Sequence, residues 1–486
     1  MRRRDAVAVG LLAAIVGVEG CKVGPAYKTP AMPAPPAYSE NGANGNPQKA
    51  NGNWSVAAPA DDKSRSAWWT VYNDAELNRL EEQCASANLS IAAASQAYEQ
   101  SHALVMSVRS ALFPTVSLGA TATRNRISSY RPLRPVTAPN YYWDFLIPLS
   151  VSWEPDIWGR VRSQIDSASA SAQASAADLA NTRLSLQGTL AASYFQVRGI
   201  DLQVKLLRST VDAYKQTLTL TEDRRKGGLA SESDVEQAKT QLESTRAQTI
   251  DAGVQRAKLE HAIAVLIGVP AQTYKLSELP LAGDPPAIPA GVPSQLLQRR
   301  PDIAMAERRV ASANAQIGIQ KAAYYPNISL GAAGGIESSD ITTLIDSNST
   351  LWNAGPSASE ILFDAGQRKA NVKAAVAQRE QAADLYRQQV LSAFRDVEDQ
   401  LSALRILAEE ADVQQRAVLS AERSTELSVL RYKRGLAPYL EVLTNQTIQL
   451  SNERVSAGLV ADRIVASVAL QVALGGGWDA AELPKN

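Results

Sequence analysis

A nine-residue segment, LFPTVSLGA at residues 112–120, occurs a second time as YYPNISLGA at residues 324–332. The two copies begin 212 residues apart. Further along the chain, RRKGGLASESDV at residues 224–235 recurs, 207 residues later, as RYKRGLAPYLEV at residues 431–442. Because the spacing stays nearly constant, the sequence predicts an internal duplication, with two halves that fold in the same order.

Segments of alternating hydrophobicity open each half. In residues 114–124 and 145–153, apolar side chains alternate with Thr, Ser or Pro, and residues 328–335 and 351–362 repeat the pattern less regularly. About 9–11 residues suffice for a tilted strand to cross a bilayer, so we predict a pair of transmembrane strands in each half. Hairpins of a soluble sheet would show the same alternation, and the pattern alone leaves both readings open.

A very long helical hairpin is predicted after each strand pair. Residues 160–226 contain no proline and only two glycines. Apolar residues from Ile200 to Leu218 are spaced alternately by four and three, and residues 235–259 continue a similar heptad seam. This spacing is typical of helices packed as a coiled coil. A helix of about 65 residues is roughly 100 Å long, and a compact domain has no room for it.

The predicted strands have to be completed by other copies of the chain. Single-chain membrane barrels have at least about eight strands, and open strand edges in lipid would leave backbone polar groups unpaired. Three copies with four strands each would supply twelve around a lumen. The predicted fold is therefore mainly α with a β-barrel part. A duplicated strand pair plus long coiled-coil hairpin forms a trimer, whose 12-stranded β-barrel is continuous with an α-helical barrel.

The N-terminus resembles that of a bacterial lipoprotein. Arginines at positions 2–4 precede an uncharged, mostly apolar stretch at residues 6–18, long enough for a signal peptide but short for a membrane-spanning helix. A small residue, Gly20, then precedes Cys21, as in a lipobox. We expect Cys21 to carry lipid at the mature N-terminus. The alternative is an ordinary signal peptide followed by an incidental cysteine.

The chain has one further cysteine, Cys84. If Cys21 carries lipid, no disulfide within the chain is possible. Lys22 follows Cys21 where an aspartate would favour retention in the inner membrane, so by resemblance to lipoprotein sorting rules we expect the outer membrane. The 49 basic and 49 acidic side chains balance, which gives no reason to expect nucleic acid as a partner.

Six parts follow one another along the chain. We predict a signal peptide at residues 1–20, a lipidated extended arm at 21–70 and the first repeat at 71–269. A proline-rich linker at 270–292, the second repeat at 293–474 and a C-terminal tail at 475–486 follow.

Several stretches resemble the TolC family of outer-membrane efflux channels, in its OprM/CusC/NodT-like lipoprotein branch. They are the segments WWTVYND at residues 68–74, RRPDI at 299–303, ANAQIG at 313–318 and CKVGPAY at 21–27. The resemblance implies a homotrimer in the outer membrane that conducts substrates passively from periplasm to exterior. It also implies two partners, a periplasmic adaptor protein and an inner-membrane pump of the resistance–nodulation–division (RND) class.

The turns of the two long hairpins are the first candidate site. Glycine at a helix C-terminus supplies a positive φ, so the turn alone accounts for the glycines. An exposed leucine is not required by a turn, and the resemblance implies docking to adaptor tips. Clustered Arg and Lys beside the turns also fit favourable dipole interactions at helix ends. The candidate contact residues are Gly228, Leu229, Ala230, Gly435, Leu436 and Ala437.

A gate at the second tip is the other candidate site. The family's tip pattern, as it stands here, implies gate candidates at Tyr432, Leu440, Glu441 and Thr444. Thr444 replaces the family's second acidic residue. Three copies of Glu441 around one axis would form an anionic ring, with Leu440 adding an apolar constriction. Alternatively, Glu441 is a solvated carboxylate favoured at a helix start.

No catalytic or metal-binding motif is recognised, so we expect no enzyme activity, no cofactor and no metal site. The two histidines, His102 and His261, lack metal-ligand spacing and are interpreted as ordinary helix residues. Two other functions remain possible from the residues alone. A periplasmic adaptor lipoprotein has one long hairpin flanked by β-segments, and a structural coiled-coil protein would form no pore.

Overall fold

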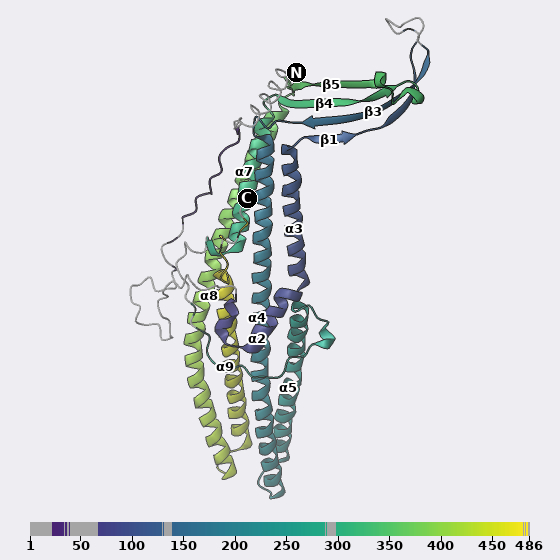
Figure 1. Ribbon diagram of the computed structural model, residues 1–486. Coiled ribbons are helices and arrows are strands. Elements are labelled where there is room, and N and C mark those ends of the chain that lie inside the picture. The colour runs from purple at the N-terminus through teal and green to yellow at the C-terminus, as the bar shows by residue number, and fades with distance from the viewer. Residues whose placement is uncertain are drawn as a thin grey trace.

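The computed structural model describes residues 22–33, 35, 38, 67–128, 130, 139–286, 288, 298–479, 481, 483 and 484. The chain forms a narrow bundle of long helices, with a sheet projecting from one end of the bundle (Figure 1). The predicted signal peptide and Cys21 lie outside the described residues, as does part of the predicted linker.

The predicted duplication is confirmed by the order and length of the elements. Each half contains a helix, a strand pair, a helix of 67 residues and a return helix of 35 residues. In the first half these are α3 (Leu89–Arg109), α4 (Arg160–Lys226) and α5 (Glu232–Leu266). In the second half they are α7 (Pro301–Ala322), α8 (Gln367–Lys433) and α9 (Tyr439–Ala473).

Shorter elements complete the fold. One further helix, α2 (Ala75–Ala87), precedes α3. The 3-10 helices are η2 (Trp68–Tyr72), η3 (Ser110–Leu112), η4 (Ala271–Thr273), η5 (Ile341–Thr343) and η6 (Ser347–Ser349). The strands are β1 (Thr115–Leu118), β2 (Thr121–Arg126), β3 (Tyr141–Trp153), β4 (Asn327–Ser338) and β5 (Thr350–Ser359).

Both 67-residue helices begin by the same device. The residue before α4, Gly159, has φ of 74°, and the residue before α8, Gly366, has φ of 89°, a left-handed conformation that glycine adopts without strain. An aspartate just upstream accepts hydrogen bonds from the first free backbone N–H groups. Asp156 accepts from Arg162 N at 2.8 Å, and Asp364 accepts from Arg368 N at 3.1 Å. The sheet therefore passes into a helix at the same kind of joint in both halves.

All strand pairs in the sheet are antiparallel, with β3 and β4 in the centre and β5 at one edge. At the other edge β1 and β2 both pair with β3, so the single strand expected at residues 114–124 is interrupted. The interruption lies opposite Pro148, which has no N–H to donate to the ladder, while its carbonyl accepts from Gly119 N at 2.9 Å.

The last strand is shorter than predicted. It was expected over residues 351–362, but β5 ends at Ser359, which pairs with Asn327 at the start of β4. The residue before β4 is Pro326, which has no N–H to continue the ladder. Three apolar residues are left exposed beyond the end of β5, at positions 361–363.

The register separates the sheet into an apolar face and a polar face, because directly opposed residues of a ladder point to the same side. The apolar face includes Val116, Leu118, Trp143, Phe145, Ile147, Leu149, Val151, Leu330, Ile336, Trp352 and Ala354. The polar face includes Thr115, Ser117, Thr121, Thr123, Asp144, Ser150, Ser152, Ser329, Glu337, Asn353 and Ser357.

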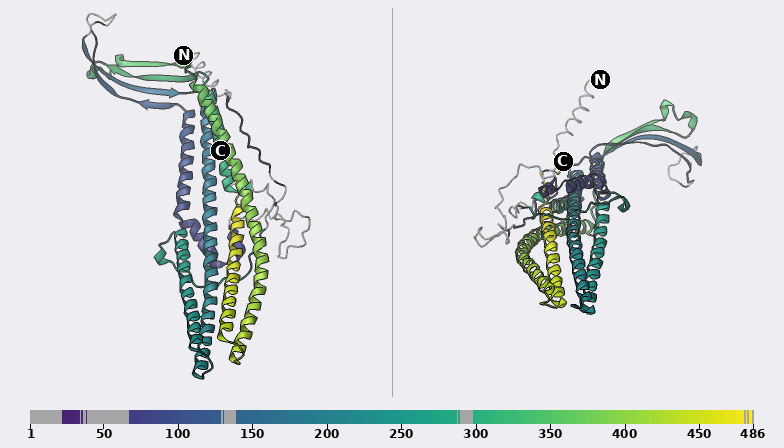
Figure 2. Two further views of the ribbon diagram at one scale, coloured as in Figure 1. Left: turned by 180° about the vertical axis from the view of Figure 1, so that it is seen from behind. Right: turned by 90° about the horizontal axis from the view of Figure 1, so that it is seen from below.

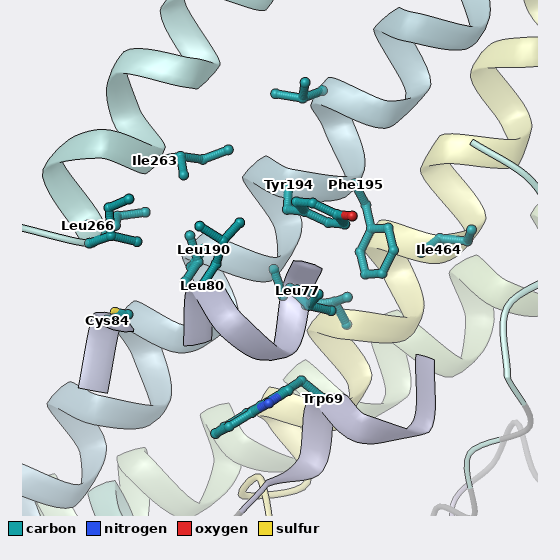
Figure 3. Close-up of a cluster of buried hydrophobic side chains, with 14 of the residues drawn as sticks. Trp69, Leu77, Leu80, Cys84, Leu190, Tyr194, Phe195, Ile263, Leu266 and Ile464 are labelled. Atoms are coloured by element: carbon teal, nitrogen blue, oxygen red, sulfur yellow. The ribbon is translucent and has the colours of Figure 1, made fainter. Parts of the chain in front are cut away.

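The helices run in pairs, α4 beside α5 and α8 beside α9, with α4 also against α9 (Figures 1 and 2). The predicted seam is confirmed where Leu207 and Tyr214 of α4 pack with Leu242 of α5 and Leu450 of α9. The largest buried cluster lies partway along the bundle, where α2 packs against α4, and includes Leu80, Leu190, Tyr194 and Ile263 (Figure 3). Several such clusters follow one another along the helices, so no single globular core is present.

Candidate functional site: the hairpin tips

The two hairpin turns have the same backbone geometry. Gly228 and Gly435 have φ of 75° and 76°. In each turn the glycine N–H bonds the carbonyl three residues back, and the following leucine N–H bonds the carbonyl five residues back. This is the Schellman motif, which satisfies the last carbonyls of a helix and reverses the chain. The duplicated glycine is thus explained locally as a helix stop, whereas the leucine that follows it is not.

Both tip leucines are largely exposed. Leu229 is 69% exposed and Leu436 is 66% exposed. Between the two turns lies an open hollow of about 350 Å³, lined by Arg224, Leu229, Asp234, Tyr432, Gly435, Leu436, Ala437, Pro438 and Tyr439. The structure therefore brings all six predicted contact residues to one end of the bundle, four of them in or beside a single hollow.

Arg224 at the end of α4 connects the first hairpin to the second. Its Nη1 donates to the carbonyl oxygen of Lys433 at 3.1 Å, and its guanidinium lies 4.6 Å from the centre of the Tyr432 ring. The Tyr432 ring is also edge-on to Tyr439, with ring centres 5.7 Å apart. The sequence pattern indicates only a favourable helix-dipole interaction for the cluster of Arg and Lys to which Arg224 belongs. Its contacts with the other hairpin are tertiary and leave no signal in local spacing.

The four gate candidates occupy different environments. Tyr432 is buried between the hairpins and is 3% exposed, whereas Leu440 is 60% exposed. Glu441 is partly exposed, and its Oε1 accepts from Arg431 Nη1 across the turn at 2.8 Å. The Thr444 hydroxyl donates to the Leu440 carbonyl of its own helix at 2.9 Å. Tyr432 is therefore enclosed within the chain, whereas Leu440, Glu441 and Thr444 all have accessible surface.

The two tips differ in their side-chain chemistry. Burial raises the pKa of the Tyr439 hydroxyl to about 12, so this phenol stays neutral at physiological pH. The first hairpin has a capping box in place of the second hairpin's aromatic pair. Ser231 Oγ accepts from Asp234 N at 3.1 Å, and Asp234 Oδ2 accepts from Ser231 N at 3.0 Å. The two tips thus share a backbone and differ in side-chain chemistry.

Both histidines lie exposed on helix surfaces, His102 on α3 and His261 on α5. Cys84 is a buried free thiol on α2, and burial, together with the nearby Glu81, raises its pKa to about 12. A thiol held neutral in this way is a poor nucleophile.

Comparison with known proteins gives a consistent result. The family profile described as "Outer membrane efflux protein" matches residues 80–269 and 292–476. The solvent efflux pump outer membrane protein SrpC of Pseudomonas putida is 30% identical over 470 residues, covering 96% of this chain and 98% of that protein. The cation efflux system protein CusC of Escherichia coli is 27% identical over 470 residues, covering 95% and 97%.

Solved structures agree with these sequence matches. The outer-membrane channel OprN superposes with a TM-score of 0.85 at 29% identity, over 94% of this chain and 100% of that chain. The CmeC outer membrane channel of Campylobacter jejuni shares the fold with a TM-score of 0.86, over 95% and 96% of the two chains, at 22% identity. With a family match over most of its length and relatives covered from end to end, the chain belongs to the outer membrane efflux protein family.

Proposed function

We propose that three copies of this chain form a duct that crosses the outer membrane and extends through the periplasm as a helical tube. As a subunit of an outer-membrane efflux channel, each copy contributes four strands to a 12-stranded barrel, with β1 and β2 counted as one interrupted strand. The observation that carries this proposal is the sheet itself, which has one apolar face, one polar face and two unpaired edges within the described residues. Such a sheet is stable in lipid only when its edges are paired by further copies.

The membrane position follows from the length of β3. Trp143 and Trp153 lie on the apolar face and are ten residues apart. At about 3.4 Å per residue and a strand tilt of about 40°, their heights differ by roughly 26 Å. This matches an apolar band of about 25 Å with an aromatic girdle at each boundary. The helices begin on the Trp153 side, which is therefore the periplasmic side.

A lipid anchor on Cys21 fits the path of the next residues. Lys22 pairs with Asp166 near the start of α4, and Val23 N donates to Trp158 O at 3.4 Å. Tyr27 and Glu307 hold the segment against α7. Lys22 therefore lies close to the proposed periplasmic boundary of the barrel, where an acyl chain on the residue before it would reach the membrane.

Acylation of Cys21 is tested by mass spectrometry of the N-terminal peptide of the mature protein. We expect lipid on Cys21 and no residues before it. An unmodified Cys21, or a mature terminus elsewhere, would contradict the anchor. Because the barrel itself should hold the protein in the membrane, we expect Cys21→Ser to retain part of its export activity.

The hairpin tips are the proposed contact with a periplasmic adaptor, which in turn joins an inner-membrane pump of the RND class. Two exposed leucines beside a hollow are the kind of apolar surface that a partner covers. The same end of the tube holds the proposed gate, at Leu440 and Glu441, with the exposed Thr444 one turn further along α9 and the buried Tyr432 supporting it from within the chain. A gate at the end nearest the pump would keep the duct closed until the partners bind.

The cargo is not set by the shared fold. Among the relatives, one is named for solvents and another for cations. Conduction through the duct is passive, and selection among cargos is assigned to the pump.

Single-channel recording of the purified protein in a planar bilayer tests the proposed function. A trimeric duct gives discrete conductance steps, whereas an adaptor lipoprotein or a structural coiled coil gives none. Well-folded trimers without conductance would overturn the proposal.

A further inference from the structure

The charged residues of the described strands are divided between the two faces of the sheet. Both acidic residues, Asp144 and Glu337, lie on the polar face. Both basic residues, Arg124 and Arg126, lie on the apolar face, directly opposite Trp143 and Tyr141. The lipid-facing side thus carries two positive charges per copy and no negative charge on any described strand residue.

The two arginines are held on aromatic rings. The Arg124 guanidinium lies 5.3 Å from the centre of the Trp143 ring, and that of Arg126 lies 5.5 Å from the Tyr141 ring. Both arginines are exposed, and among the described residues neither forms an ion pair with a carboxylate. Stacking on a ring orients a guanidinium while its N–H donors remain free on the outward side.

The height of these pairs places them at a membrane boundary. Trp143 marks the outer girdle of the apolar band, and Tyr141 and Arg126 lie two residues further out. An arginine facing lipid costs about 2–4 kcal/mol at the bilayer midplane and almost nothing at the interface. The arginines are therefore at the level of the headgroups of the outer leaflet, where anionic groups are the available partners.

We propose that Arg124 and Arg126 form a binding site for phosphate-bearing lipid headgroups of the outer leaflet, with three such sites around the trimer. Guanidinium groups bind phosphate oxygens through paired N–H donors, and the ring beneath each one packs against the first apolar part of the lipid. The site rests on the proposed barrel, because it needs the apolar face to point to lipid. Its role is to fix the depth and rotation of the barrel in the membrane.

The test is a lipid titration of the purified full-length protein, with bound lipid counted by native mass spectrometry. The two probes are lipid A carrying its phosphates and the same glycolipid after removal of the phosphates. We expect the phosphorylated lipid to bind at least about tenfold more tightly, since each basic side chain near an anionic lipid contributes about fivefold.

Variants assign that preference to the two arginines. R124Q/R126Q should reduce the preference to within about twofold, while R124K/R126K, which keeps the charge, should retain most of it. The matched control is R395Q/R423Q, which removes the same charge from exposed positions on α8. Preference that persists in R124Q/R126Q, or is absent in the parent, would overturn the site. Displacement of the lipid by millimolar inorganic phosphate would instead identify a site for free anions and would overturn the lipid assignment.

Conductance separates failure of this site from failure of the duct. The Arg124 and Arg126 variants should give the single-channel conductance of the parent protein, because these two side chains face away from the lumen of the proposed barrel. A conducting trimer without lipid preference would refute only the proposed lipid site. A trimer that does not conduct would refute the proposed channel function on which the site rests.

Discussion

At the scale of single residues, Glu441 is subject to two opposing effects. Within one copy its carboxylate is paired with Arg431 at 2.8 Å, in an exposed arrangement that is worth less than about 1 kcal/mol. Around the trimer axis, three copies of the same carboxylate would repel one another and attract cations. The pair with Arg431 lowers that repulsion without removing it, and attracted cations would offset the rest. The closed ring would then depend on weak interactions, which a partner can outweigh.

Replacing Glu441 by Ala is expected to weaken block by divalent cations from the periplasmic side by at least about fivefold, because one charge is worth about 1 kcal/mol and the variant trimer loses three. Leu440→Ala should increase leakage of large antibiotics, because it widens the apolar constriction. Single-channel recording and drug susceptibility measure the two effects.

The corresponding position in the first hairpin, Asp234, is an imperfect control because it belongs to a capping box. Its replacement by Ala would cost about 1 kcal/mol of helix stability. Glu236→Ala is better matched, since it removes an exposed carboxylate whose one ion-pair partner among the described residues is Lys239, one helical turn away. If Glu441→Ala and Leu440→Ala conduct and block like Glu236→Ala, the gate lies elsewhere.

Glu81 presents a different problem at the same scale. It is completely buried on α2, and neither carboxylate oxygen has a hydrogen-bond partner among the described residues. Burial raises its pKa to about 9 from the ordinary value of 4.5. Between these two pH values the unfolded chain has lost the proton and the folded chain retains it. Stability is therefore greatest below pH 4.5 and falls as pH rises toward 9, by up to about 1.4 kcal/mol per pH unit.

Glu81→Gln should remove this contribution, because the amide stays neutral. We expect its thermal midpoint to exceed that of the parent protein by a margin that widens from pH 5 to pH 8. The neighbouring Glu82→Gln, at an exposed position on the same helix, is the control and should leave the pH slope unchanged. Parallel slopes for Glu81→Gln and the parent would contradict the neutral, buried state of Glu81.

At the scale of the element, each hairpin turn depends on one glycine. A Cβ at Gly228 would meet no other atom within 4 Å, so only the left-handed backbone restricts this position. The preceding residue, Gly227, has φ of −80°, which any residue adopts. Alanine substitutions at these two adjacent glycines therefore differ mainly in whether the backbone has a positive φ, and comparing them isolates that requirement.

Gly228→Ala is expected to destabilise the turn by about 1–2 kcal/mol, and Gly435→Ala by a similar amount. Gly227→Ala should be neutral or slightly stabilising, since it also restricts the unfolded chain. Hydrogen exchange of the tip amides measures the local effect. Equal exchange in Gly227→Ala and Gly228→Ala would show that the turn is not held by the positive φ.

At the scale of the whole molecule, the assembly depends on which face of the sheet meets lipid. Leu149 and Ser150 are adjacent in β3, near the middle of the proposed membrane band, and point to opposite faces. An arginine at the first position would face hydrocarbon, and one at the second would face the lumen.

Leu149→Arg should reduce the yield of membrane-inserted trimer sharply, since a lipid-facing arginine near the midplane costs about 2–4 kcal/mol in each copy. Ser150→Arg should insert normally and change conductance, because it adds charge to the pore. Trimer yield and conductance are measured together. The reverse pattern would mean that the polar face is the outer one.

The sequence predicted the long helices well because their signals are local. Residues 160–226 lack proline, and Gly159 and Gly227 bracket the helix at its two ends. The interruption between β1 and β2 was missed because its cause, Pro148, lies on the partner strand. The contacts of Arg224 and Arg431 were missed for the same reason. They join segments that only the folded hairpins bring together, whereas periodicity reports one segment at a time.

The equal lengths of the paired helices have a consequence for how the chain can change. Both long helices have 67 residues and both return helices have 35. Deleting one residue shortens a helix by about 1.5 Å and rotates everything beyond it by about 100°. The seam would then face the wrong neighbour, and one tip would stand out of level with the other. Selection should therefore remove single-residue insertions and deletions along the full length of the helices, even at exposed positions where most substitutions are harmless.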